Sequence, residues 1–165
     1  MKRKRLVRFF DSIGRIGSFI GGITGAIFIF LMTLLITVDV LGRAVGMPTY
    51  VADEMSGYLL VGIVFLGLAY TQRKGKHIQI TILTNRLSPR KQELLQIAIL
   101  MVVLIFIGWL TWATFGPAIQ NYVVKATSLT IVATPLWIPW LFIPLGLVML
   151  TIELMVELVK AIRPR

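Results

Sequence analysis

Cysteine is absent from this chain of 165 residues, and histidine occurs once, at His77. Without cysteine there is no disulfide, no catalytic thiol and no cysteine-ligated metal cluster. A single histidine also excludes a haem held between two histidines, a histidine-rich metal site and a relay of paired histidines. His77 follows several basic residues, and we expect it to contact a lipid headgroup or the backbone rather than to act as a catalytic base.

Charged residues are scarce as well. They make up 15% of the chain, against 57% hydrophobic residues, whereas a typical soluble domain has about 25% charged residues. The composition therefore predicts a membrane protein.

Four segments are long and apolar enough to cross a hydrocarbon core, which requires about 20 helical residues. They lie near 16–38, 51–71, 94–115 and 137–156. The first resembles a secretory signal in following basic residues, but its 23 residues exceed the about 7–15 of a signal core, so we expect it to be retained. Residues 1–165 are thus expected to form one all-α membrane domain with four transmembrane helices.

The basic residues are distributed unevenly. Fifteen of the 17 Lys and Arg residues lie before the first span, between the second and third, or after the fourth; the other two are Arg43 and Lys125. Because cytoplasmic loops carry the excess of Lys and Arg, both termini and the middle connection are expected in the cytoplasm. Orientation and contact with anionic membrane lipids then account for the net charge of +10, and we expect no nucleic-acid partner.

Two stretches outside the spans have an apolar side. Before the first span, apolar residues from Leu6 to Ile16 recur at spacings of three and four, which predicts an amphipathic helix on the inner leaflet; a disordered basic tail is the alternative. Between the second and third spans, residues 78–87 predict a short interfacial helix, although their isoleucines also alternate as in a strand. Ser88 and Pro89 suit the cap and first turn of the third spanning helix.

Small residues form two adjacent stripes within the first span. Such stripes let another helix approach closely in a membrane, where apolar lipid gives helices no hydrophobic drive to associate. The partner is either another span of this chain or a second protein. The stripes are Gly17, Gly21 and Gly25, and Ser18, Gly22 and Ala26.

Two pairs of charged residues stand four apart near the ends of spans. Asp39 and Arg43 would meet on one face of a helix, as a local ion pair or as part of a transport pathway. Glu153 and Glu157 lie near the inner end of the fourth span, where we expect a solvated helix end or a pair with a basic neighbour.

Asp53 and Glu54 open the second span. The unpaired amides and positive dipole of a helix N-terminus favour an anion there, with Asp53 as cap or first-turn acid. A functional alternative is a sodium or proton site. Such sites usually gather several oxygens near the bilayer midplane, whereas these two acids lie at the end of a span. We therefore expect a structural joint that pairs with Arg43 or with a basic residue of a partner.

The stretch "VDVLGRAVGMPTYVADEMSGYLLVGIVFLGLAYTQRKGKHIQITILTNRLSP", residues 38–89, resembles the small membrane subunit, DctQ, of tripartite ATP-independent periplasmic (TRAP) transporters. The resembling features are Arg43, the acidic pair, Gly67, the His77-Ile78 dipeptide that follows the basic residues after the second span, and the Leu-Ser-Pro turn. The later "WIPWLFIPLG", residues 137–146, also fits that family.

The resemblance implies a complex in the bacterial inner membrane. Its partners would be a large DctM-like permease and a periplasmic DctP-like binding protein, and it would import organic acids with a sodium gradient. The large subunit would carry the substrate and sodium sites, so we expect no cofactor, no metal and no catalytic residue in this chain, which would brace the permease. The alternative is a self-sufficient homodimeric transporter that binds a cation or proton at Asp39 or Glu153; a membrane enzyme ranks third.

Overall fold

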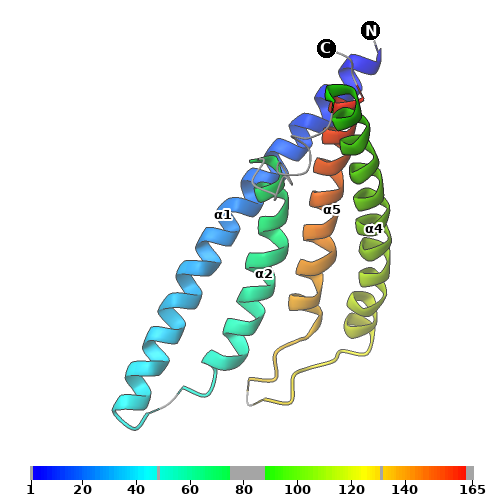
Figure 1. Cartoon of the computed structure of the whole chain (residues 1–165). Helices are drawn as coiled ribbons and strands as arrows, with labels where there is room; N and C mark the ends of the chain where they lie inside the picture. The colour runs from blue at the N-terminus through cyan, green and yellow to red at the C-terminus, as the bar shows by residue number, and fades with distance from the viewer. Residues whose placement is uncertain (1, 48, 75–87, 131, 163–165) are drawn as a thin grey trace.

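The computed structural model describes residues 2–47, 49–74, 88–130 and 132–162, and within them four α-helices run side by side (Figure 1). All four are long and apolar enough to cross a membrane, which confirms the predicted spans. The helices are α1, Lys2–Ala44; α2, Ala52–Arg73; α4, Pro89–Val123; and α5, Trp137–Ala161.

The two ends of the bundle differ. Both chain termini lie at one end (Figure 1), which we call the terminal end; α2 ends there and α4 begins there. The connections α1–α2 and α4–α5 lie at the opposite end, which we call the loop end. The cytoplasmic side of the bundle stays a prediction.

α1 is one continuous helix of 43 residues. At about 1.5 Å per residue it is about 65 Å long, roughly twice the thickness of a hydrocarbon core. Residues 2–15 are helical, as the spacing predicts, but they continue into the span instead of forming a separate helix; the first proline of the chain is Pro48, so no proline interrupts them. The apolar face of residues 2–10 lies outside the described side chains, and its place on the leaflet stays a prediction.

α5 is the central helix. Both α2 and α4 pack along it, while α1 packs on α2 and, over a shorter length, on α5. In the most apolar stretch of α5, 39% of the residues are buried, against 11% in α1 and 6% in α4. The bundle therefore leaves wide apolar faces on its two outer helices.

Glycines bring the backbones of three helices together at the middle of α2. A Cβ atom on Gly21 of α1 would lie 2.2 Å from the carbonyl oxygen of Leu66, and one on Gly146 of α5 would lie 2.1 Å from that of Phe65. Neither position has room for a side chain. Close approach of this kind replaces the missing hydrophobic drive between helices in a membrane.

The helix starts agree with the turn chemistry of the sequence. α4 begins at Pro89 with Ser88 at the N-cap position, as predicted, but the Ser88 side chain makes no capping hydrogen bond. α2 begins at Ala52, so Asp53 and Glu54 both lie in its first turn. The predicted interfacial helix at 78–87 and His77 lie outside the described residues.

Replacing Gly21 or Gly146 with Ala should lower the free energy of unfolding by about 1–3 kcal/mol, because the added methyl group overlaps a backbone carbonyl. Gly108→Ala in α4 is the matched control, since a Cβ atom there would meet nothing within 4 Å; the better helix propensity of Ala should then give equal or higher stability. Thermal unfolding of the detergent-purified variants measures the difference. Equal melting temperatures for all three variants would contradict the close packing.

Candidate functional site

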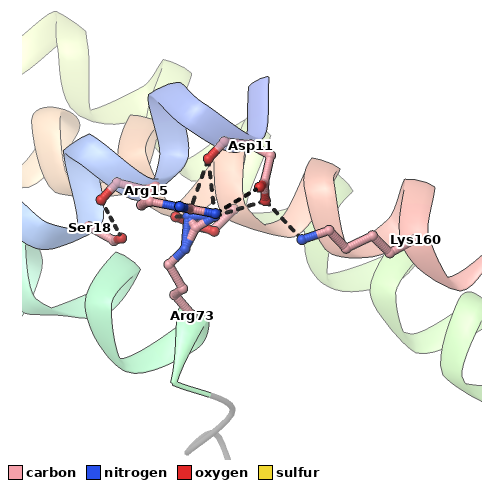
Figure 2. Close-up of polar contacts among 6 residues, drawn as sticks. Asp11, Arg15, Ser18, Arg73 and Lys160 are labelled. Carbon is pink, nitrogen blue, oxygen red and sulfur yellow. Dashed lines mark hydrogen bonds and ion pairs between the residues drawn. The ribbon is translucent and has the colours of Figure 1, made fainter. Parts of the chain in front are cut away.

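Arg73, the last residue of α2, joins three helices at the terminal end. Its Nη2 lies 2.8 Å from Oδ1 of Asp11 in α1, and its Nη1 lies 3.3 Å from Oε1 of Glu153 in α5. Both nitrogens also donate to the Asp11 carbonyl oxygen, at 3.1 and 3.4 Å. Figure 2 shows the Arg73 side chain reaching from α2 to α1. One guanidinium thus connects α2 to both of its neighbours.

Glu153 is the buried member of this cluster, with 5% of its side chain exposed. A buried carboxylate needs a cation and hydrogen bonds to offset its lost hydration, and Arg73 supplies the cation. Gly14 of α1 leaves space for the carboxylate, because a Cβ atom there would lie 2.9 Å from Oε1. The glycine therefore has a role in seating this acid.

Two further cations surround Asp11. Lys160 of α5 lies 2.8 Å from its Oδ1, and Arg15 lies 3.7 Å from its Oδ2 (Figure 2). Near them the Gln72 amide donates a hydrogen bond to the Glu157 carboxylate, which joins α2 to α5 a second time. We call Asp11, Arg15, Arg73, Glu153 and Lys160 the terminal cluster.

Asp39 anchors the loop end of α1. Its Oδ2 accepts a 2.6 Å hydrogen bond from Nε of Arg43, and its Oδ1 accepts hydrogen bonds from the backbone amide and the hydroxyl of Thr49. Gly46, at φ +75°, allows the sharp turn that brings Thr49 back to Asp39. Arg43 also reaches Oδ2 of Asp53 in α2 at 3.3 Å, so it links the two helices.

Glu54 connects α2 to the α4–α5 connection. Its Oε1 accepts a 2.8 Å hydrogen bond from the Tyr58 hydroxyl, and its Oε2 accepts one from the Thr130 hydroxyl. Ser128 then bonds the Thr130 hydroxyl at 2.7 Å and accepts from the Thr134 amide at 3.1 Å. The carboxylate thereby organises the connection that leads into α5.

The small-residue stripes contact several neighbours. Gly21 and Gly25 are buried and face the α2 backbone at Leu66 and Ile63, whereas a Cβ atom at Gly22 would meet the Tyr70 ring and one at Gly17 would meet Met149. Ser18 is buried with 2% exposure and donates a hydrogen bond to the Arg15 carbonyl. Ala26 is exposed. At Gly21, Gly22 and Gly25 the neighbour is thus a span of this chain.

The structure brings Arg43 and Asp53 together, as the sequence suggests, and separates Glu54 from them, because Glu54 bonds Thr130 instead. Sequence reasoning missed Asp11, Arg73 and Thr130 as partners. An acid inside an apolar span signals the need for a cation, but the sequence offers many cations and does not rank them.

The arrangement is that of interhelical joints. Six of the seven carboxylates in the chain bond a cation, a hydroxyl or an amide of the same chain; they are Asp11, Asp39, Asp53, Glu54, Glu153 and Glu157. Among the described residues no three histidines or acids converge on a metal-binding position. In the structure these acids link helices to one another or to the connections between them.

Residues 32–164 match the family of tripartite ATP-independent periplasmic transporters, DctQ component. The ectoine TRAP transporter small permease protein TeaB of Halomonas elongata is 24% identical over 141 residues, which cover 85% of this chain and 72% of that protein. A putative TRAP transporter small permease protein of Haemophilus influenzae is 30% identical over 96 residues, which cover 56% of this chain and 60% of that protein.

Four helices long and apolar enough to span a membrane, three of them joined by polar contacts, define a multi-pass membrane protein. The chain belongs to the DctQ family, the small permease component of TRAP transporters. Proteins of this family are transporter subunits, which confirms the expectation that the chain is not an enzyme. Membership implies association with the other components of such a transporter, a large permease and a binding protein.

Replacing Arg73 with Met should lower the free energy of unfolding by about 3–5 kcal/mol, because Glu153 then stays buried without its cation. The double variant with Glu153→Met should recover part of this loss, since an apolar pair leaves no unpaired charge. Denaturant titration of the purified variants measures both values. Arg15→Met, whose side chain is 76% exposed, is the control with little expected change; a double variant whose loss equals the sum of the two single losses would argue against the pair.

Asp39→Asn should lower the melting temperature clearly more than Asp53→Asn. Asp39 is 5% exposed and holds both Arg43 and Thr49, whereas Asp53 is 86% exposed and bonds Arg43 in solvent, where an ion pair contributes little. Both substitutions remove one charge and keep the side-chain shape, so each controls for the other. Equal melting temperatures would show that the α1–α2 turn does not depend on the buried acid.

Proposed function

We propose that this chain braces the large permease of a sodium-driven TRAP transporter, which imports an organic acid delivered by a periplasmic binding protein. The observation that carries the proposal is a contrast within the bundle. Polar contacts join α1, α2 and α5, whereas the apolar outer faces of α1 and α4 are almost entirely uncovered by the chain itself. In the most apolar stretches of α1 and α4, 11% and 6% of the residues are buried. Such faces fit lipid or the helices of a larger membrane partner.

The internal pairing of the acids favours a bracing role over ion transport by this chain alone. Asp39 and Glu153 are the two residues that a self-sufficient transporter would use, and each is engaged with an arginine of the chain. A carboxylate that binds and releases a cation in each cycle would have to break these joints every time. Sodium coupling and substrate binding are therefore assigned to the large permease.

The proposed orientation places the terminal end in the cytoplasm and the loop end in the periplasm of a bacterial inner membrane. The support is the positive-inside distribution, with fifteen of 17 Lys and Arg residues before the first span, between the second and third, or after the fourth in the sequence. The exposed carboxylate of Asp53 would then face the periplasm, where we propose that it contacts a basic residue of the large permease or the binding protein.

A tagged copy of this chain, purified from native membranes in mild detergent, should recover a large multi-span permease. Because the chain has no cysteine, single cysteines at Phe30 of α1 and Ile105 of α4, which are 68% and 73% exposed, can then show by crosslinking which outer face the permease covers. A cysteine at Leu129 in the loop-end connection, which is 105% exposed, is the control. Recovery of the chain without any permease would contradict the proposal.

Reconstitution provides the functional measurement. Liposomes that hold this chain with its permease should take up an organic acid when a sodium gradient and the binding protein are supplied, and liposomes that hold this chain alone should not. Ectoine belongs among the substrates tested, because a relative at 24% identity carries that name. Uptake by this chain alone that Asp39→Asn or Glu153→Gln abolishes would favour the self-sufficient transporter instead.

A further inference from the structure

An apolar groove lies between α1 and α5 toward the terminal end, and neither the packing of the bundle nor the proposed function uses it. Its volume is about 370 Å³. Gly14 and Gly17 of α1 form part of its lining, and Met149 and Ile152 of α5 lie opposite. The groove is open beside Gly17 because that position carries no side chain, whereas the space beside Gly14 holds the Glu153 carboxylate.

The groove ends at the terminal cluster. Asp11 precedes Gly14 by three residues, or about 4.5 Å along a helix, and it binds Lys160 of α5 at 2.8 Å. This ion pair therefore crosses from one helix to the other just beyond the groove. On α5, Ile152 and Val159 are seven residues apart and share a face, and Val159 is 38% exposed, so an apolar path leads from the groove to Lys160.

The terminal end of the bundle is rich in basic residues. In the terminal cluster three cationic side chains face two carboxylates, Glu157 lies near them, and the Lys160 side chain is 58% exposed. Among the described residues, eleven Lys and Arg residues lie toward this end of the helices, against two, Arg43 and Lys125, at the loop end. A lysine at a membrane surface attracts anionic lipid headgroups. An apolar groove that lies near an accessible ammonium group is complementary to an acyl chain joined to an anionic headgroup.

We propose that this groove binds one acyl chain of an anionic phospholipid, with the lipid phosphate beside Lys160. The lipid fills the space beside Gly17 and completes the contact between α1 and α5. A transmembrane helix is about 10–12 Å wide with its side chains, and the groove is lined on α1 by about one and a half turns, Ile13 to Gly17. The size of the groove thus suits a chain of methylene groups better than a partner helix.

The test uses Gly17→Leu in the full-length chain. A Cβ atom at Gly17 would lie 3.8 Å from Met149 Cγ, which is ordinary contact, so the larger side chain fills the groove without displacing α2. Gly108→Leu on α4, where a Cβ atom would meet open space, is the matched control. Native mass spectrometry of protein purified in detergent with equal phosphatidylglycerol and phosphatidylcholine counts the retained lipids.

The wild-type chain and Gly108→Leu should each retain one phosphatidylglycerol in preference to phosphatidylcholine, and Gly17→Leu should lose it. Lys160→Gln should reduce the preference for phosphatidylglycerol by about fivefold, as expected for one lysine near a headgroup. Retention of phosphatidylglycerol by Gly17→Leu, or equal retention of both lipids by the wild type, would overturn the proposal. Loss of the large permease from Gly17→Leu with lipid retention unchanged would also overturn it, by assigning the groove to a partner helix.

Discussion

The contact between Arg73 and Glu153 is the interaction on which the rest of the bundle depends. Glu153 lies in the most buried helix, with 5% of its side chain exposed and Arg73 at 3.3 Å. Because an unpaired carboxylate at this depth is strongly unfavourable, the last turn of α2 has to lie where its arginine reaches α5. That requirement fixes the register of α2 against α5 and leaves room on α1 only for Gly14 beside the carboxylate.

α2 is also held at its loop end and at its middle. Arg43 joins α1 to α2 through Asp53, and Glu54 holds the connection into α5 through Thr130. At the middle of α2, Gly21 of α1 and Gly146 of α5 contact the adjacent carbonyl groups of Leu66 and Phe65. α2 therefore contacts α1 or α5 near both of its ends and at its middle. The apolar faces that remain lie mostly on α1 and α4.

The sequence predicts the architecture well because apolar runs of membrane length leave few alternatives. The four spans and the Asp39–Arg43 pair follow from local patterns, the latter because residues four apart meet on a helix. The helices extend past the predicted spans, as in α1, because hydropathy marks the hydrocarbon region and not the end of helical hydrogen bonding. The polar contacts between distant segments could not be predicted from the sequence, because the partners are far apart along the chain. Arg73 and Glu153 are 80 residues apart, and Glu54 and Thr130 are 76 apart.

Which acids are buried and bonded within the chain could also be seen only in the structure. Asp53 and Glu54 stand out in the sequence because they are adjacent and precede an apolar run. Asp39 is less conspicuous there, yet Thr49 folds back over it and leaves 3% of the residue exposed. Burial of an acid at a helix end depends on where the following turn goes, and a glycine with positive φ at residue 46 decides that here.

The most direct measurement of the central claim is a distance between α2 and α5 at the terminal end. The chain contains no cysteine, so a pair of spin labels on cysteines introduced at Thr71 of α2 and Val159 of α5, which are both exposed, reports this distance without background. The wild-type protein should give one narrow distance distribution, and Arg73→Met should broaden or shift it, because the residue that joins α2 to α5 is gone. An unchanged narrow distribution in Arg73→Met would show that Arg73 does not set the arrangement of the helices.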